Sequence, residues 1–203
     1  MSVPLDPPPN SRFAEVRRST REVDVCAELE LDGTGRANVR TGLPFLDHMI
    51  SSLARHASFD LTLQASGDLE VDDHHTVEDC AIVLGRALWQ ALGDARDIER
   101  FGFGFAPLDE ALARAVVDLA GRPWPAVELR LEREMLGQVA TENLTHFLNT
   151  FAIESRMALH VRLLAGANDH HKAEAAFKAT AVALRRAVRR TRSGIPSTKG
   201  VLA

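Results

Sequence analysis

One short pattern, His-His-x-x-Glu behind an acidic residue, occurs twice in this chain of 203 residues. The first copy spans residues 74–78 and the second spans residues 170–174. A further histidine precedes each copy at a similar distance, His48 before the first and His146 before the second. Because the chain has only 8 histidines, chance does not account for two matched sets. The pattern indicates a tandem duplication of one ligand-bearing unit.

The chemistry of the pattern favours metal binding. On a helix the first histidine and the glutamate four positions later share one side, whereas adjacent histidines point about 100° apart. Each His-His pair therefore suits two different ions. The ligands divide evenly into three imidazoles and one carboxylate for each of two ions, a set that suits Mn, Fe or Zn and leaves positions open. Local capping by helix-start histidines is the alternative, and it explains a single copy better than a duplicated one. The eight candidate ligands are His48, His74, His75, Glu78, His146, His170, His171 and Glu174.

The apolar pattern predicts similar elements in a first unit, residues 12–93, and a second unit, residues 94–192. In the first unit, alternation over residues 23–31 predicts a strand that runs into a hairpin turn at residues 32–35. After it we expect a helix over 44–56, a strand over 59–65 and a helix over 74–92.

The second unit is predicted to begin with a connection. Residues 94–107 are rich in Gly and Phe and are expected to be irregular. A strand near 115–119 and a partner strand near 127–131 follow. The remaining expected elements are a helix over 144–153, a strand over 160–165 and a helix over 171–190.

The two ends of the chain are expected to lie outside the repeats of one compact domain. Residues 1–11 contain three consecutive prolines and predict an extended tail. Residues 193–203 contain two glycines and a proline and should not be helical. Within them, Ser197, Thr198 and Lys199 offer two hydroxyls and an ammonium, which suit a phosphate, although a mobile polar terminus is the simpler interpretation.

Composition narrows the classes of function. The chain is 45% apolar and 26% charged, as in globular proteins, and its net charge of −4 argues against general nucleic-acid binding. Five arginines between residues 185 and 192 are expected to form a solvated helix end. No apolar run is long enough to span a membrane and no signal segment is evident, so we expect a cytoplasmic protein. Cys26 and Cys80 are interpreted as thiols in the interior, and His56 and His160 as surface or packing residues.

Several longer motifs together resemble one family. From about Arg12 to Leu202 the chain closely resembles imidazoleglycerol-phosphate dehydratase of histidine biosynthesis. Val23, Ala120 and Thr150 depart from the usual family residues, and none of these departures removes a ligand or a charge. The motifs that carry the resemblance are residues 42–49, 73–79, 121–123, 146–148, 168–179 and 197–200.

The resemblance implies an α/β (α+β) fold with an internally duplicated β-β-α-β-α type unit. Four helices would form a layer between two four-stranded mixed sheets. The resemblance also implies a homo-oligomer of 24 subunits with active sites between subunits, and two Mn²⁺ per active site.

The implied reaction is dehydration of D-erythro-imidazole glycerol 3-phosphate to imidazole acetol phosphate, through a metal-bound imidazolate and a diazafulvene-like intermediate, with Glu22 moving the proton. The implied catalytic residues are Glu22, His48, His75, Glu78, His171 and Glu174. The implied substrate-binding residues are Glu22, His48, His74, Arg100, Arg122, His170, Lys178, Ser197, Thr198 and Lys199.

Two other classes of function remain as alternatives. A phosphohydrolase with two metal ions would release inorganic phosphate. A metal-binding shell without catalysis would require long unbroken helices, which the spacing of Gly and Pro in this chain disfavours.

Overall fold

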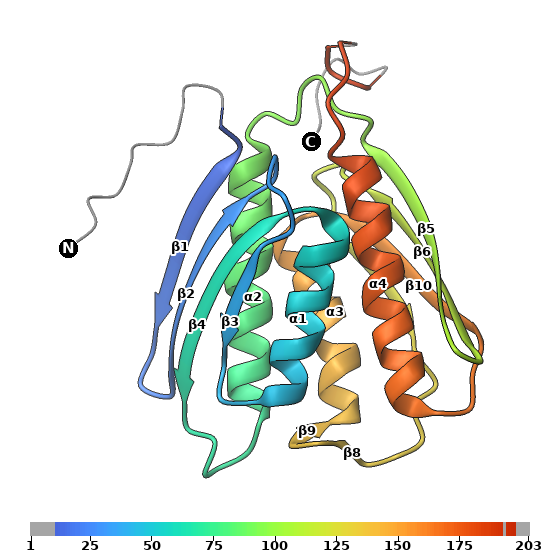
Figure 1. Ribbon diagram of the computed structural model, residues 1–203. Helices are drawn as coiled ribbons and strands as arrows, with labels where there is room; N and C mark the ends of the chain where they lie inside the picture. The colour runs from blue at the N-terminus through green and yellow to red at the C-terminus, as the bar shows by residue number, and fades with distance from the viewer. Residues whose placement is uncertain (1–10, 193, 198–203) are drawn as a thin grey trace.

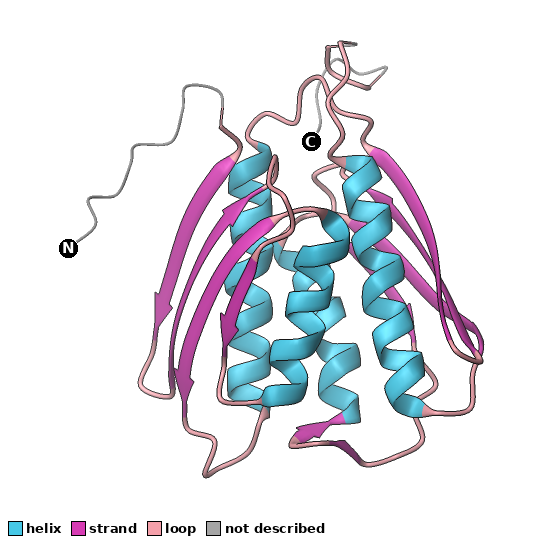
Figure 2. Ribbon diagram, in the orientation of Figure 1, coloured by secondary structure: helices cyan, strands magenta, loops and turns pink. Residues whose placement is uncertain are grey.

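Four helices stand side by side between two four-stranded sheets in a computed structural model that describes residues 11–192 and 194–197 (Figures 1 and 2). The expected α/β architecture and its duplication are confirmed. The first half contains β1 (Phe13–Ser19), β2 (Val23–Glu30), β3 (Ala37–Arg40), α1 (Pro44–Ala57), β4 (Asp60–Gly67) and α2 (His74–Leu92). The second half contains β5 (Phe101–Leu108), β6 (Ala111–Asp118), β7 (Trp124–Glu128), β8 (Met135–Leu136), β9 (Val139–Ala140), α3 (Thr141–Glu154), β10 (Ala158–Ala165) and α4 (Asp169–Ala187).

The two sheets have the same topology. Their strand orders are β1-β2-β4-β3 and β5-β6-β10-β7, and in each sheet only the last pair is parallel. Two predictions of strand pairing are therefore wrong. The hairpin joins β1 to β2 around residues 20–22, whereas the turn at 32–35 leads into β3, which lies beyond β4. The strand predicted near residues 127–131 runs from Trp124 to Glu128, and it pairs with β10 instead of β6. Alternation identifies a strand, but it does not identify a distant partner.

Half of the Gly- and Phe-rich segment expected to be a connection, residues 101–107, belongs to strand β5, which is a further correction. Its phenylalanines point outward and its glycines point toward α4. A Cβ atom on Gly102 would lie 1.9 Å from the Ala183 carbonyl oxygen, and one on Gly104 would lie 2.4 Å from the Ala179 carbonyl oxygen. The glycines are therefore needed for close approach of the helix, a use of Gly in strands that resembles a loop signal in the sequence.

The helices pack in two pairs, α1 with α4 and α2 with α3. All four begin at the same end of the molecule, the lower end in Figure 1. Apolar side chains from both sheets and all helices form one continuous core. Cys80 is buried, Cys26 is half-buried, and both are free thiols as expected. Among the described residues, no helix is long and apolar enough to cross a membrane. The expected N-terminal tail falls outside the described residues except for Ser11.

Candidate metal centres and active site

Six of the eight predicted ligands form two clusters, and in each cluster three ligand atoms lie within 4.8 Å of one another. One cluster contains His48 from α1 with His170 and Glu174 from α4. The other contains His146 from α3 with His74 and Glu78 from α2. Each cluster thus combines the first helix of one half with the second helix of the other half. We call them the α1–α4 cluster and the α2–α3 cluster.

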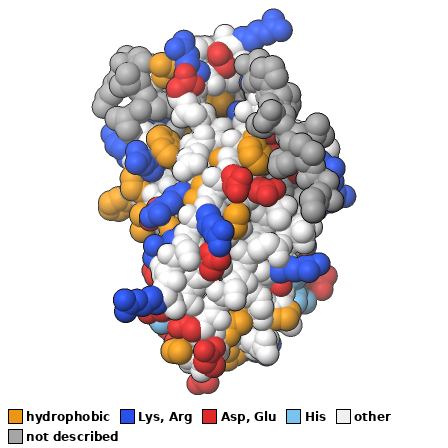
Figure 3. Space-filling view, turned by 90° about the vertical axis from the view of Figure 1, so that its left-hand side faces the viewer, with side chains coloured by type: hydrophobic (Ala, Val, Ile, Leu, Met, Phe, Trp, Pro, Cys, Tyr) orange, Lys and Arg blue, Asp and Glu red, His pale blue; other side chains and the backbone are white. Residues whose placement is uncertain are grey.

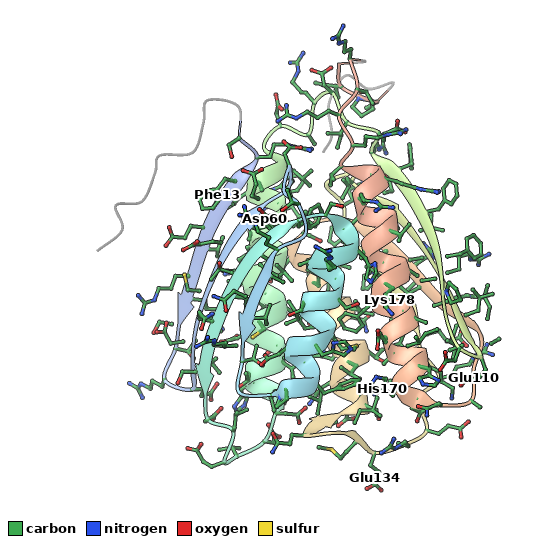
Figure 4. All side chains as sticks on the ribbon, in the orientation of Figure 1. Phe13, Asp60, Glu110, Glu134, His170 and Lys178 are labelled. Atoms are coloured by element: carbon green, nitrogen blue, oxygen red, sulfur yellow. The ribbon has the colours of Figure 1, made fainter. Side chains whose placement is uncertain are left out.

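The carboxylate of Glu174 is the centre of the α1–α4 cluster. Its Oε2 lies 3.1 Å from His48 Nε2 and 3.3 Å from His170 Nε2, and its Oε1 accepts a 2.6 Å contact from Lys178 Nζ. Burial opposes ionisation of this carboxyl, but the contacts with Lys178 and His48 prevail and lower its pKa to about 2. Glu174 is therefore an anion at neutral pH. Figure 4 shows His170 near the lower end of α4 and Lys178 further along the same helix.

The α2–α3 cluster is arranged by different neighbours. His146 Nε2 lies 3.0 Å from Glu78 Oε1, and the rings of His74 and His146 stack with their centroids 4.9 Å apart. His74 Nδ1 lies 3.0 Å from the amide oxygen of Asn143, a buried residue of α3. This contact orients the ring so that Nε2 is available as a ligand. The cluster borders an open hollow lined by residues of α2 and α3, among them Asn149.

The second histidine of each His-His pair lies apart from both clusters of its own chain. His75 Nδ1 lies 3.1 Å from Asp68 Oδ2, and His171 Nδ1 lies 2.7 Å from Glu110 Oε2. Each contact raises the pKa of its histidine. A carboxylate on Nδ1 is the arrangement common to metal-ligating histidines, with Nε2 as the ligand atom, although His171 Nε2 also lies 3.6 Å from Asp109 Oδ2. The predicted divergence of adjacent histidines is thus observed, while their role as ligands stays a prediction.

Glu22, the predicted proton carrier, stands immediately before β2 and is exposed. Its Oε2 lies 3.9 Å from His75 Nδ1, so it belongs with His75 at the lower end of the molecule. Glu110 occupies the matching position before β6, beside His171, and the sequence reasoning missed it. Backbone N–H groups of Asn168 and Ala167 and the His171 ring lower the pKa of Glu110 to about 2. Aligning the two repeats would have paired Glu22 with Glu110.

Arg100 and Ser197, two of the predicted phosphate-binding residues, lie at the other end of the molecule. The Arg100 backbone N–H donates to the carbonyl of Ala187, the last residue of α4. The Arg100 guanidinium contacts Asp118 at 2.7 and 3.1 Å and donates to the Pro196 carbonyl, next to Ser197. Because a helix rises about 1.5 Å per residue, about 25 Å separates this end of α4 from His170. Arg122 is exposed, and Thr198 and Lys199 fall outside the described residues.

The arginines near the end of α4 make contacts at the protein surface with residues distant in sequence, and Arg189 and Arg190 stay largely exposed. Arg190 pairs with Asp32, Arg189 pairs with Glu99, and the Arg186 guanidinium lies over the Phe103 ring. His56 and His160 are exposed and belong to neither cluster.

Comparisons with known proteins agree with one another. A family model described as imidazoleglycerol-phosphate dehydratase matches residues 41–184. A protein of that name from Candida glabrata is 51% identical over 211 residues, which cover 94% of this chain and 100% of that protein. One from Cereibacter sphaeroides is 51% identical over 194 residues, with coverage of 94% and 100%. The crystal structure of the Staphylococcus aureus protein of that name has a TM-score of 0.80 at 34% identity and covers 88% of this chain and 99% of that chain.

Proposed function

The chain belongs to the imidazoleglycerol-phosphate dehydratase family and is a hydro-lyase of histidine biosynthesis, and from this premise we propose that it acts through two divalent cations, Mn²⁺ by preference. The observation that carries the proposal is the pair of clusters, each with two imidazoles and one carboxylate. These donors, without thiolate, fit Mn²⁺ and leave positions for substrate. When bound, the cations supply Lewis acidity to the imidazole ring of the substrate.

Glu22 moves the proton in this proposal. The hydrogen to be removed sits on the carbon that bears the ring, and no carbonyl makes it acidic. An exposed carboxylate beside His75 can accept that proton and return it to the departing hydroxyl, which leaves as water. The resulting enol then becomes the ketone. Substitution of Glu22 by Gln retains the shape and removes the base.

Arg100 and Arg122, with Ser197, Thr198 and Lys199, bind the substrate phosphate in this proposal. The guanidinium has five N–H donors, and Arg100 uses three of them on partners among the described residues, which leaves two in that part of the chain for phosphate oxygens. Its contacts with Asp118 and Pro196 fix the plane of the group. Geometric fit of a fixed guanidinium to phosphate is a common basis for such recognition.

One active site then requires more than one copy of the chain. A glycerol phosphate three carbons long cannot reach over the roughly 25 Å between the α1–α4 cluster and Arg100. His75 and His171 also present ring nitrogens away from their own clusters. The outer face of the second sheet exposes Phe101, Phe103 and Phe105, an apolar surface typical of an interface. We therefore propose a homo-oligomer, with 24 subunits as in the family, in which His75 and His171 complete clusters of neighbouring copies.

The deciding experiment is incubation of Mn²⁺-loaded protein with imidazole glycerol phosphate, followed by assay of ketone and of free phosphate. Ketone without phosphate supports dehydration. Release of phosphate indicates hydrolysis, and neither product indicates a metal-binding shell. Removal of Mn²⁺ by a chelator, followed by sizing and assay, tests the role of the cations, because full activity without metal contradicts it.

A further inference from the structure

The two clusters are related by the duplication, yet their neighbours differ at two matched positions. Four residues after the cluster glutamate stands Lys178 on α4 but Ile82 on α2. Three residues before the cluster histidine stands Phe45 on α1 but Asn143 on α3. Each difference changes how its cluster receives a cation.

The first difference places an ammonium in direct contact with Glu174, whereas Arg18, a cation that interacts electrostatically with Glu78, forms its ion pair with Asp79 instead. Lys178 Nζ lies 2.6 Å from Glu174 Oε1, and the Lys178 side chain is 19% exposed, so water screens the contact only partly. A cation that binds the Glu174 carboxylate must approach this ammonium or displace it. Glu78 has Ile82 at the matching position, which carries no charge. The α1–α4 cluster is therefore the less favourable site for a divalent cation.

The second difference concerns whether a histidine ring is already held in its orientation before a cation binds. Asn143 holds the His74 ring through Nδ1 at 3.0 Å, so the ring need not be reoriented when a cation arrives. His170 instead meets the edge of the Phe45 ring, with centroids 5.2 Å apart. Among the described residues, no side chain forms a hydrogen bond with His170 Nδ1. This difference, like the first, makes the α1–α4 cluster the less favourable site for a cation.

We propose that cations fill the α2–α3 cluster before the α1–α4 cluster. Lys178 is the positioning residue that sets the gap, by which we mean the difference in cation affinity between the two clusters. The inference rests on the proposed function for the existence of two cation sites. It adds that the duplicated sites differ in affinity, and that one ammonium causes most of the difference.

The test is calorimetric titration of the full-length, metal-stripped protein with MnCl₂. We expect two classes of site whose dissociation constants differ by about tenfold or more, since removal of an outer-shell partner typically changes metal affinity about 10- to 100-fold. Lys178→Ile copies the α2 sequence and should tighten the weaker class at least about fivefold. Ile82→Lys copies the α4 sequence and should weaken the tighter class by a similar factor.

Two control variants separate charge from other effects. Lys178→Arg keeps the positive charge and should keep the gap. Arg185→Ile removes a positive charge two turns further along α4, away from Glu174, and should change neither class more than about twofold. Circular dichroism on every variant verifies the fold, and Asn143→Phe offers an independent test that should weaken the tighter class.

The outcomes are distinct. Equal affinities in the unmodified protein, or a gap that persists in Lys178→Ile, would overturn the inference while leaving the two cation sites in place. Absence of Mn²⁺ binding to the unmodified protein would overturn the proposed function itself.

Discussion

The outer face of the first sheet carries charged and polar side chains, whereas the outer face of the second sheet carries a row of aromatic ones. Figure 3 shows basic and acidic groups interspersed over the first sheet, and Arg17 pairs there with Asp24 at 2.7 Å. On the second sheet Phe101, Phe103 and Phe105 are each more than half exposed. The inner faces of both sheets are buried against helices. The shared fold therefore constrains the inner faces of the halves and leaves the outer faces free to differ.

The contrast extends to the packing of helix against sheet. At the inward positions where β5 has Gly102 and Gly104, the matching strand β1 has Ala14 and Val16. Because glycine has no side chain, α4 can approach its sheet more closely than α2 approaches the first. Thus similar topologies are stabilised by different contacts. The comparison between halves can be tested at four points.

The largest expected effect comes from the cluster carboxylates. Glu78→Gln and Glu174→Gln each remove the only carboxylate from one cluster. We expect dehydratase activity to fall more than about 100-fold in both, beyond the range for outer-shell partners. Metal titration should distinguish the two variants, because each should lose a different class of site. Loss of the same class by both would show that the clusters do not act as separate sites.

The next effect comes from the carboxylates that hold His75 and His171. Asp68→Asn and Glu110→Gln should each lower metal affinity or activity about 10- to 100-fold. A carboxylate that raises the pKa of a histidine makes it retain its proton to higher pH, and a bound proton competes with metal. The acid limb of the metal-binding profile should therefore move to lower pH in both variants. An unchanged profile would contradict this role.

A smaller effect concerns stability. Gly104→Ala places a Cβ 2.4 Å from the Ala179 carbonyl oxygen and should cost about 1–3 kcal/mol of unfolding free energy through overpacking. The control, Val16→Ala in the first half, removes two buried carbon atoms and should cost about 1–2 kcal/mol through lost burial. Chemical denaturation measures both. A stabilising Gly104→Ala would show that α4 can move away from β5 at no cost.

The smallest effect lies where the halves meet. Asp32 accepts hydrogen bonds from Arg12 and Arg190, and these contacts, against the effect of partial burial, lower its pKa to about 2. Because the folded-state pKa is depressed, the stabilisation is present above about pH 4 and is lost as pH falls toward 2. The Asp32 side chain is 40% exposed, so we expect less than about 1 kcal/mol. Asp32→Asn should lose this part of the pH dependence, and the unmodified protein and the variant should converge near pH 2.

The parts of this structure that the sequence predicts are those that rest on local periodicity. The helix that carries His74 and Glu78 begins at His74 as expected, because spacing of apolar residues and a preceding turn mark it. Strand β5 was missed because alternating Phe and Gly resembles an irregular segment until the position of α4 is known. The division of ligands between clusters depends on which helices pair, and helix pairing is set by contacts between distant parts of the chain. Glu110 lacks a motif of its own.

Each cluster combines one helix from each half of the chain, and this has a consequence for the evolution of the duplicated chain. Neither half of the chain contains a complete cluster, since His48 needs α4 and His146 needs α2. A half-length precursor would bind cations in this way only as a pair of identical chains, with two identical sites related by a twofold axis. Once two copies are fused in one chain, the two sites no longer have to be identical. The two sites could then come to differ, with Lys178 at one and Ile82 at the other.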